Sequence, residues 1–331
     1  MPADDGWAFK TYRDYLASYE RLLEVFGTGE KRFASIRSAV LAACGNRMPV
    51  RDPQKPVDEI RRALRNAWAT EIGMALPGEF GDDRFIAASL HWLGPQAYYA
   101  VYQAGLAALI AKDQPPPDSH QKFLGAVHSQ FSARGMLPAP WDAACNKGSV
   151  GAGGHVYAGC LAGSSPLTTT SYPGDEDEAK RVLCLALKTT RDRRFDDLKD
   201  SILRGKQVKT KAGRAAKRLT LARQNSAYEG MATTTTFDFL YRLRIRSNYR
   251  DADTFLSQNV GDVRAFYTEL VGLARCTLHA LESLVAVGIG EKSFGAEVTA
   301  FGRRRLPSFA AQQSVLARWP AFAPASAGVT P

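Results

Sequence analysis

The side chains most capable of chemistry in this 331-residue sequence are basic, and many of them lie between residues 188 and 223. Thirteen lysines and arginines stand there against four aspartates, which accounts for most of the formal net charge of +10. Such a patch neutralises phosphates, and the counterions that it displaces make binding weaken as salt rises. The segment therefore predicts contact with a polyanion, although a solvated charged helix face would have the same composition.

A second basic group lies in the sequence DFLYRLRIRSNYRDADTFL, which runs from Asp238 to Leu256. Arg242, Arg244 and Arg246 occupy alternate positions there and precede an Asn-Tyr pair. Residues four apart share a helix face, so Arg242 and Arg246 would point the same way. An arginine–aspartate lattice on a helix surface would also fit this pattern. The residues that we expect to contact nucleic acid are Arg204, Lys206, Lys209, Lys211, Arg214, Lys217, Arg218, Arg242 and Arg246.

The elements that must hold these side chains are predicted to be helices. Apolar residues recur at three- and four-residue spacing along most of the chain, and we find no alternating strand pattern and no hairpin signal. The fold class is therefore predicted to be all-α. The clearest helical segments span residues 12–26, 57–68, 82–93, 96–112, 118–131, 237–256 and 260–287.

The stretch from Gly135 to Gly174 differs in composition, because Gly, Pro, Ser and Thr replace the helical pattern. We expect a loop there. Its glycines resemble a phosphate-binding loop only superficially, since no Gly-Lys-Ser/Thr follows. Cys145, His155 and Cys160 lack the paired spacing of zinc ligands. The sequence accordingly predicts neither a metal nor a cofactor.

Two further stretches resemble the HEPN domain, an all-α bundle of prokaryotic toxin–antitoxin and antiviral-defence proteins. AYYAVYQAGLAALIA, followed by Ser119-His120, is similar to the aromatic-rich second helix of the family and to the Ser/Thr-His that starts the next helix. LRIRSNY is similar to the family's Leu-Arg-x-x-Ala-Asp-Tyr or Arg-x4-His motif. The helix expected at 260–287 matches the closing helix, so the likeness covers residues 82–134 and 237–287.

The resemblance implies a metal-independent endoribonuclease in which Arg244 binds the scissile phosphate. Asn248 falls at a polar position of the motif, and Tyr249 stands where the family has histidine. Tyrosine, with a reference pKa of about 10, is a poorer base at neutral pH than histidine at about 6.5. Tyr249 would then donate a proton or orient Arg244, and a non-cleaving member is the alternative. We expect His120 to serve at its helix start rather than in acid–base work.

The likeness divides the chain into three parts. Residues 1–80 form an N-terminal helical region, and residues 81–290 form the HEPN-like bundle, interrupted by a loop and basic helical insertion at about 135–236. Residues 291–331 are expected to be a C-terminal tail. The N-terminal residues lack the apolar core of a secretory signal, and the five cysteines are scattered. These features favour a cytoplasmic protein without membrane spans.

The first functional hypothesis is an RNA-associated protein of antiviral defence or toxin–antitoxin type, in which Arg244 and Tyr249 carry any cleavage. The resemblance implies a homodimer or a protein partner in a defence complex, because the family's site usually forms between two protomers. The alternative is a non-catalytic module that binds nucleic acid or an acidic partner through the basic insertion. A DNA-binding regulator is less favoured, since no helix-turn-helix pattern is found.

Overall fold

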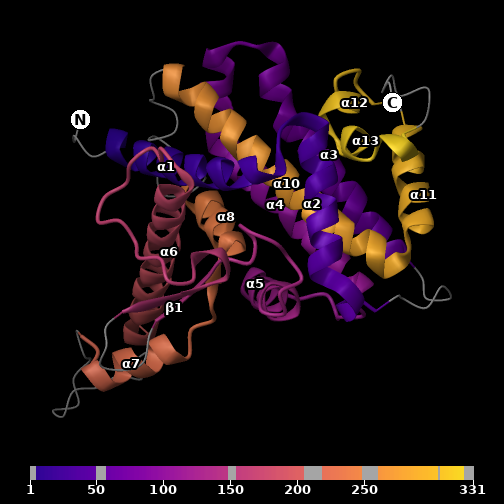
Figure 1. The fold of residues 1–331 in the computed structure, drawn as a ribbon. Helices are drawn as coiled ribbons and strands as arrows, with labels where there is room; N and C mark the ends of the chain where they lie inside the picture. Colours follow the sequence, from indigo (N-terminus) through magenta and orange to yellow (C-terminus); the bar gives the residue numbers. More distant parts are fainter. Residues whose placement is uncertain are drawn as a thin grey trace.

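The computed structural model of the chain describes residues 5–49, 57–147, 154–204, 218–247, 260–304 and 306–323. These residues are mostly helical, as the apolar periodicity predicts (Figure 1). Short turns of 3-10 or π type follow several of the helices and one strand. They are Glu24–Phe26, Gly45–Arg47, His128–Ser132, Gly159–Leu161 and Pro320–Phe322.

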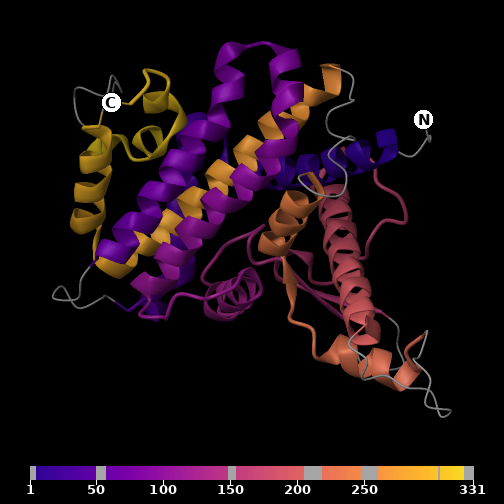
Figure 2. The same ribbon diagram turned by 180° about the vertical axis from the view of Figure 1, so that it is seen from behind.

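Three long helices lie side by side at the centre of the fold, and Figure 2 shows them from behind. They are α3 (Asp58–Phe80), α4 (Asp83–Ala111) and α10 (Val260–Ile289). The turn between α3 and α4 is encoded locally. Gly81 takes a positive φ of 66°, and the Asp82 side chain accepts a hydrogen bond from the Arg84 N–H at 2.8 Å. From Asp262 onward α10 is long and apolar enough to cross a membrane, but it is mostly buried inside the bundle.

The remaining large helices cover this centre from one side. Helix α1 (Asp5–Leu23) packs on α10 and α6, and α2 (Gly29–Cys44) packs on α10. Helix α6 (Glu176–Arg204) and the shorter α7 (Leu221–Glu229) project from the bundle in Figure 1. Helix α8 (Thr236–Ile245) packs on both α4 and α6, and α5 (His120–Val127) packs on α4.

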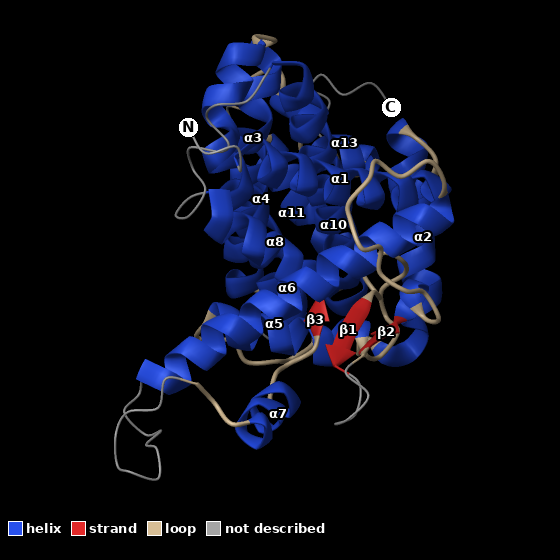
Figure 3. Ribbon diagram, turned by 90° about the vertical axis from the view of Figure 1, so that its left-hand side faces the viewer, coloured by secondary structure: helices blue, strands red, loops and turns tan. Residues whose placement is uncertain are grey.

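A small antiparallel sheet corrects the prediction that residues 135–174 form only loop and that the chain has no strands. It consists of β1 (Ala144–Lys147), β2 (His155–Ala158) and β3 (Thr234–Thr235), in the order β2-β1-β3 beneath α6 (Figure 3). Strands of two to four residues are too short to show an alternating pattern. Strand β3 lies at the C-terminal end of the insertion, far along the chain from β1, with which it pairs. The local sequence therefore could not indicate this pairing.

The predicted C-terminal tail is likewise a folded part of the protein as far as residue 323. It contains α11 (Glu291–Gly302), α12 (Ala310–Gln313) and α13 (Val315–Arg318). One continuous hydrophobic core extends from Phe9 to Trp319, and so includes the N-terminal region, the bundle and this C-terminal segment. Helices α12 and α13 have four residues each, so packing against the core rather than intrinsic helix propensity stabilises them.

Candidate functional site

Helix α8 carries the predicted arginines, and contacts near both of its ends hold this helix in place. At its start, the Asp238 carboxylate accepts hydrogen bonds from the Thr235 N–H at 2.8 Å and from the Thr235 hydroxyl at 2.9 Å. Further along, α8 crosses α4 at Gly94. A Cβ there would lie 2.5 Å from Ser247 Oγ and 3.3 Å from the Leu243 carbonyl oxygen. The glycine therefore lets α8 approach α4 closely enough for its side chains to meet those of α4.

Arg244 points from α8 into a group of tyrosines on α4. Its Nη2 donates a hydrogen bond to the Tyr99 hydroxyl at 2.8 Å. The guanidinium carbon lies 4.9 Å from the Tyr99 ring centroid and 5.6 Å from the rings of Tyr98 and Tyr241. Cation–π contacts of this kind hold the guanidinium in a fixed position while it remains half exposed.

His120 belongs to the same group of aromatic residues. Its Nδ1 is hydrogen-bonded to the Tyr98 hydroxyl at 2.9 Å, and its ring centroid lies 4.9 Å from that of Tyr102 and 5.7 Å from that of Tyr241. Partial burial lowers the pKa of the imidazole, and the positive charge of nearby Arg244 lowers it further. We call Arg244, His120 and the tyrosines at 98, 99, 102 and 241 the Arg244–His120 cluster.

The position of His120 revises what we expected of it. His120 is the first residue of α5, so it does stand at a helix start, and Ser119 is the N-cap. The same residue also lies beside Arg244, which the sequence reasoning missed. The signal available in the sequence was the Ser119-His120 pair, which follows a helix that carries Tyr98, Tyr99 and Tyr102.

Several of the predicted site residues cannot be placed. Asn248 and Tyr249 lie outside the described residues. So do Lys206, Lys209, Lys211, Arg214 and Lys217. Arg204 ends α6 and Arg218 precedes α7, and both are exposed. Neither of these two lines the cavity described next.

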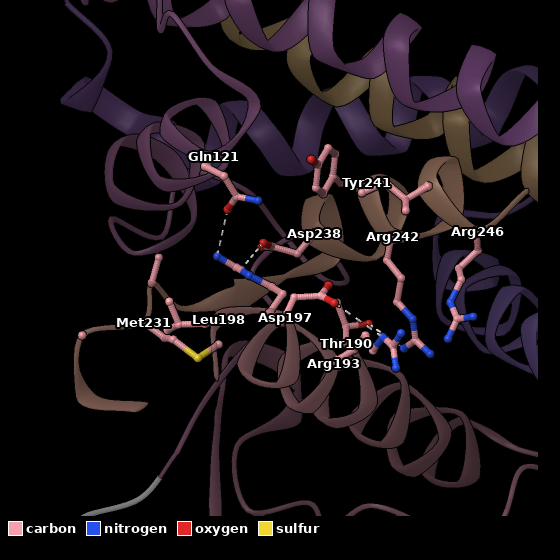
Figure 4. Close-up of a pocket in the computed structure, with 14 residues that line it drawn as sticks. Gln121, Thr190, Arg193, Asp197, Leu198, Met231, Asp238, Tyr241, Arg242 and Arg246 are labelled. Atoms are coloured by element: carbon pink, nitrogen blue, oxygen red, sulfur yellow. Dashed lines mark hydrogen bonds and ion pairs between the residues drawn. The ribbon is translucent and has the colours of Figure 1, made fainter. Parts of the chain in front are cut away.

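A cavity of about 530 Å³ lies beside the cluster, between α6 and α8 (Figure 4). Arg242 and Arg246 line it from α8, as their predicted shared face requires, whereas Arg244 does not line it. Tyr241 lines it too, and so belongs both to the cavity and to the Arg244–His120 cluster. The remaining lining residues are Gln121, Thr190, Arg193, Arg194, Asp197, Leu198, Gly230, Met231, Ala232, Asp238 and Ile245.

Positive charge exceeds negative charge around this cavity, since four arginines and two aspartates line it. Arg194 forms an ion pair with buried Asp238, and Arg193 Nε lies 4.0 Å from an Asp197 oxygen. Arg242 differs from both. Its Nη1 donates to the Thr189 and Thr190 hydroxyls at 2.8 and 3.1 Å.

The ring of Tyr12 supports the Arg242 guanidinium as well, with its centroid 5.4 Å from the guanidinium carbon. Among the residues that the structure describes, no carboxylate pairs with Arg242. Its charge is therefore held in place by neutral groups and is not cancelled by them. A cation held in this way is suited to binding a phosphate.

A third group of reactive side chains lies on the small sheet. Cys145 Sγ is 3.6 Å from His155 Nδ1, and His155 Nε2 is 3.3 Å from Asp192 Oδ1. The two ring nitrogens contact different partners, so the geometry is that of a relay and not of a metal chelate. The thiol is fully buried, and burial raises the pKa of Cys145 to about 11. It is therefore protonated and shielded at neutral pH, which makes it a poor nucleophile.

Comparisons with family models, with curated proteins and with solved structures find no match to this chain. The likeness to HEPN domains accordingly rests on the motifs quoted above. The function must be inferred from the Arg244–His120 cluster, the cavity and their charges.

Proposed function

We propose that this protein is a HEPN-like RNA-binding protein that cleaves RNA without a metal ion. Arg244 binds the scissile phosphate, and His120 transfers a proton. One observation carries this proposal: Tyr98 is hydrogen-bonded to the His120 imidazole and also lies beneath the Arg244 guanidinium. A cation and a titratable base from distant parts of the chain thus belong to one half-exposed cluster.

The chemistry follows from the protonation states. The lowered pKa of His120 leaves the imidazole neutral at pH 7, and burial raises the pKa of Tyr98 so that its hydroxyl stays protonated. When Nδ1–H of His120 donates to the Tyr98 oxygen, Nε2 is free to accept a proton. His120 then removes the proton from a ribose 2′-hydroxyl, and the 2′-oxygen attacks the phosphorus.

The bond from phosphorus to the 5′-oxygen breaks in this step, which leaves a 2′,3′-cyclic phosphate, and the departing oxygen takes up a proton. Arg244 stabilises the negative charge that develops on the phosphate oxygens. Tyr249 remains the candidate donor of the second proton. Tyr249 stands where the family has its histidine, so in this proposal His120, and not Tyr249, is the base.

The alternative function is RNA binding without cleavage, through the cavity and the basic insertion. The excess of arginine over aspartate at the cavity favours it. The scattered cysteines favour action in the cytoplasm, and the HEPN resemblance implies a homodimer or a protein partner in a defence or toxin–antitoxin complex. Both functions predict RNA as the partner, and cleavage separates them.

The test is an RNA-cleavage assay in EDTA with single-stranded and structured substrates. We expect Arg244→Ala and His120→Ala each to lower the rate by a factor of about a hundred or more, the usual contribution of a group that stabilises charge in the transition state and of a proton-transfer group, respectively. Tyr249→Phe tests the second proton transfer. Arg303→Ala, an exposed arginine at the end of α11, is the matched control and should cleave normally.

Cleavage that requires Mg²⁺, or that survives in both Arg244→Ala and His120→Ala, would rule out this mechanism. No cleavage by the unaltered protein, together with salt-sensitive RNA binding, would support the non-catalytic alternative.

A further inference from the structure

The cavity between α6 and α8 adjoins the Arg244–His120 cluster. Tyr241 contributes to both, since its ring lies 5.7 Å from that of His120 and also lines the cavity. Gln121, which follows His120 in α5, lines the cavity as well. A strand with one phosphate at the cluster would therefore bring its neighbouring nucleotide to the cavity.

The charges of the cavity match a single phosphate. Arg242 is fixed by two threonine hydroxyls and by the Tyr12 ring, and no described carboxylate neutralises it. Its Nε is buried, and among the described residues none accepts a hydrogen bond from it. The guanidinium thus has unused donor capacity and needs little reorganisation to bind an anion.

The rest of the cavity is suited to an apolar ring. Leu198 and Met231 line it from α6 and from the segment after α7, and Ile245 lines it from α8. The volume of about 530 Å³ is within the range of small-molecule sites, roughly 300–1,000 Å³. A base that is paired in a duplex would keep its partner and could not enter.

We propose that this cavity is a subsite for one unpaired nucleotide, with the phosphate on Arg242 and the base against Leu198 and Met231. The inference rests on the proposed function in one respect, namely that the nucleotide belongs to the RNA strand held at the Arg244–His120 cluster. Helix α6 supplies one wall of the subsite, so the insertion that interrupts the bundle selects single-stranded substrate.

The test measures binding separately from cleavage. In His120→Ala protein, fluorescence anisotropy compares a labelled 12-nucleotide single strand with a duplex of the same sequence. Arg242→Gln removes the phosphate contact, and Leu198→Trp fills the space for the base. Arg303→Gln is the matched control, because it removes one positive charge at an exposed side chain outside both the basic insertion and the cavity.

We expect Arg242→Gln to weaken binding of the single strand about tenfold or more, as for a hydrogen bond to a charged group. The slope of the logarithm of the binding constant against the logarithm of the salt concentration should also become shallower, by about the amount expected for one phosphate contact. Leu198→Trp should weaken the single strand and leave the duplex unchanged. Arg303→Gln should change single-strand binding less than threefold.

Competition with mononucleotides and with inorganic phosphate shows whether the cavity binds a whole nucleotide or only an anion. Displacement of the strand by adenosine or uridine monophosphate, but not by phosphate alone, would support the subsite. Displacement by phosphate as readily as by a mononucleotide would show an anion site without a base pocket, and would overturn the proposal.

Unchanged single-strand binding in both Arg242→Gln and Leu198→Trp would also overturn it, even if the protein cleaves RNA. Conversely, loss of binding in these variants of a protein that does not cleave would support the subsite and refute only the catalytic proposal. The two proposals therefore fail on different results.

Discussion

The strongest prediction for the stability of the fold concerns Arg318 in α13. Its guanidinium is fully buried between two fully buried carboxylates, Glu71 of α3 and Glu282 of α10. Nη2 donates to Glu71 at 3.0 Å and to Glu282 at 2.6 Å, and Nε donates to Glu282 at 3.1 Å. Arg318→Met keeps the length and apolar stem of the side chain but removes its charge.

The expected loss follows from the groups that remain. Removing one partner of a buried ion pair costs about 3–5 kcal/mol, because the other charge stays buried without compensation. Here two carboxylates remain, although burial raises the pKa of Glu71 and lets that group take up a proton. Arg275 Nε, 3.4 Å from Glu71, offsets part of the remaining charge. We therefore expect Arg318→Met to lower the free energy of unfolding by about 4 kcal/mol.

Urea unfolding, followed by tryptophan fluorescence, measures this loss, and Arg303→Met on the protein surface is the control. A further variant, Arg318→Met with Glu282→Gln, should regain part of the stability, since it removes one of the uncompensated charges. A loss below about 1 kcal/mol for Arg318→Met would refute the view that this ion pair joins the C-terminal segment to the core.

Three other predictions concern the site and its supports. If neutral His120 is the base, kcat/KM should fall at acid pH as the imidazole takes up a proton. Its lowered pKa places the midpoint of this acidic limb below the reference value of about 6.5, and a midpoint above that value would contradict this role. Gly105→Ala should lower the free energy of unfolding by about 1–3 kcal/mol and weaken cleavage, because the added Cβ would lie 2.6 Å from the Phe123 ring that anchors α5. Thermal unfolding measures this loss, and Gly125→Ala, with open space around it, is the control. Cys145, buried and with its pKa raised to about 11, should resist iodoacetamide at pH 8 until the protein is unfolded, as mass spectrometry can determine.

The sequence alone determined those features that depend on neighbours along the chain. Apolar residues at helical spacing predicted α10 and the two halves of α4, and the near-continuous apolar character of residues 96–112 predicted burial of the second half. The predicted break between the halves was wrong, because α4 continues through Pro95 as a single helix. The spacing of Arg242 and Arg246 predicted the face that they share at the cavity. These inferences held because helix periodicity and side-chain direction are local properties of the backbone.

The tertiary structure alone decided which distant residues meet. Arg244 contacts Tyr99 across 145 positions of sequence, and Arg318 contacts Glu71 across 247. Such pairs depend on how closely and at what angle helices pack, as at Gly94, where one absent methyl group lets α8 approach α4. Local patterns carry no record of these packing angles, so the place of His120 beside Arg244 became visible only in the folded chain.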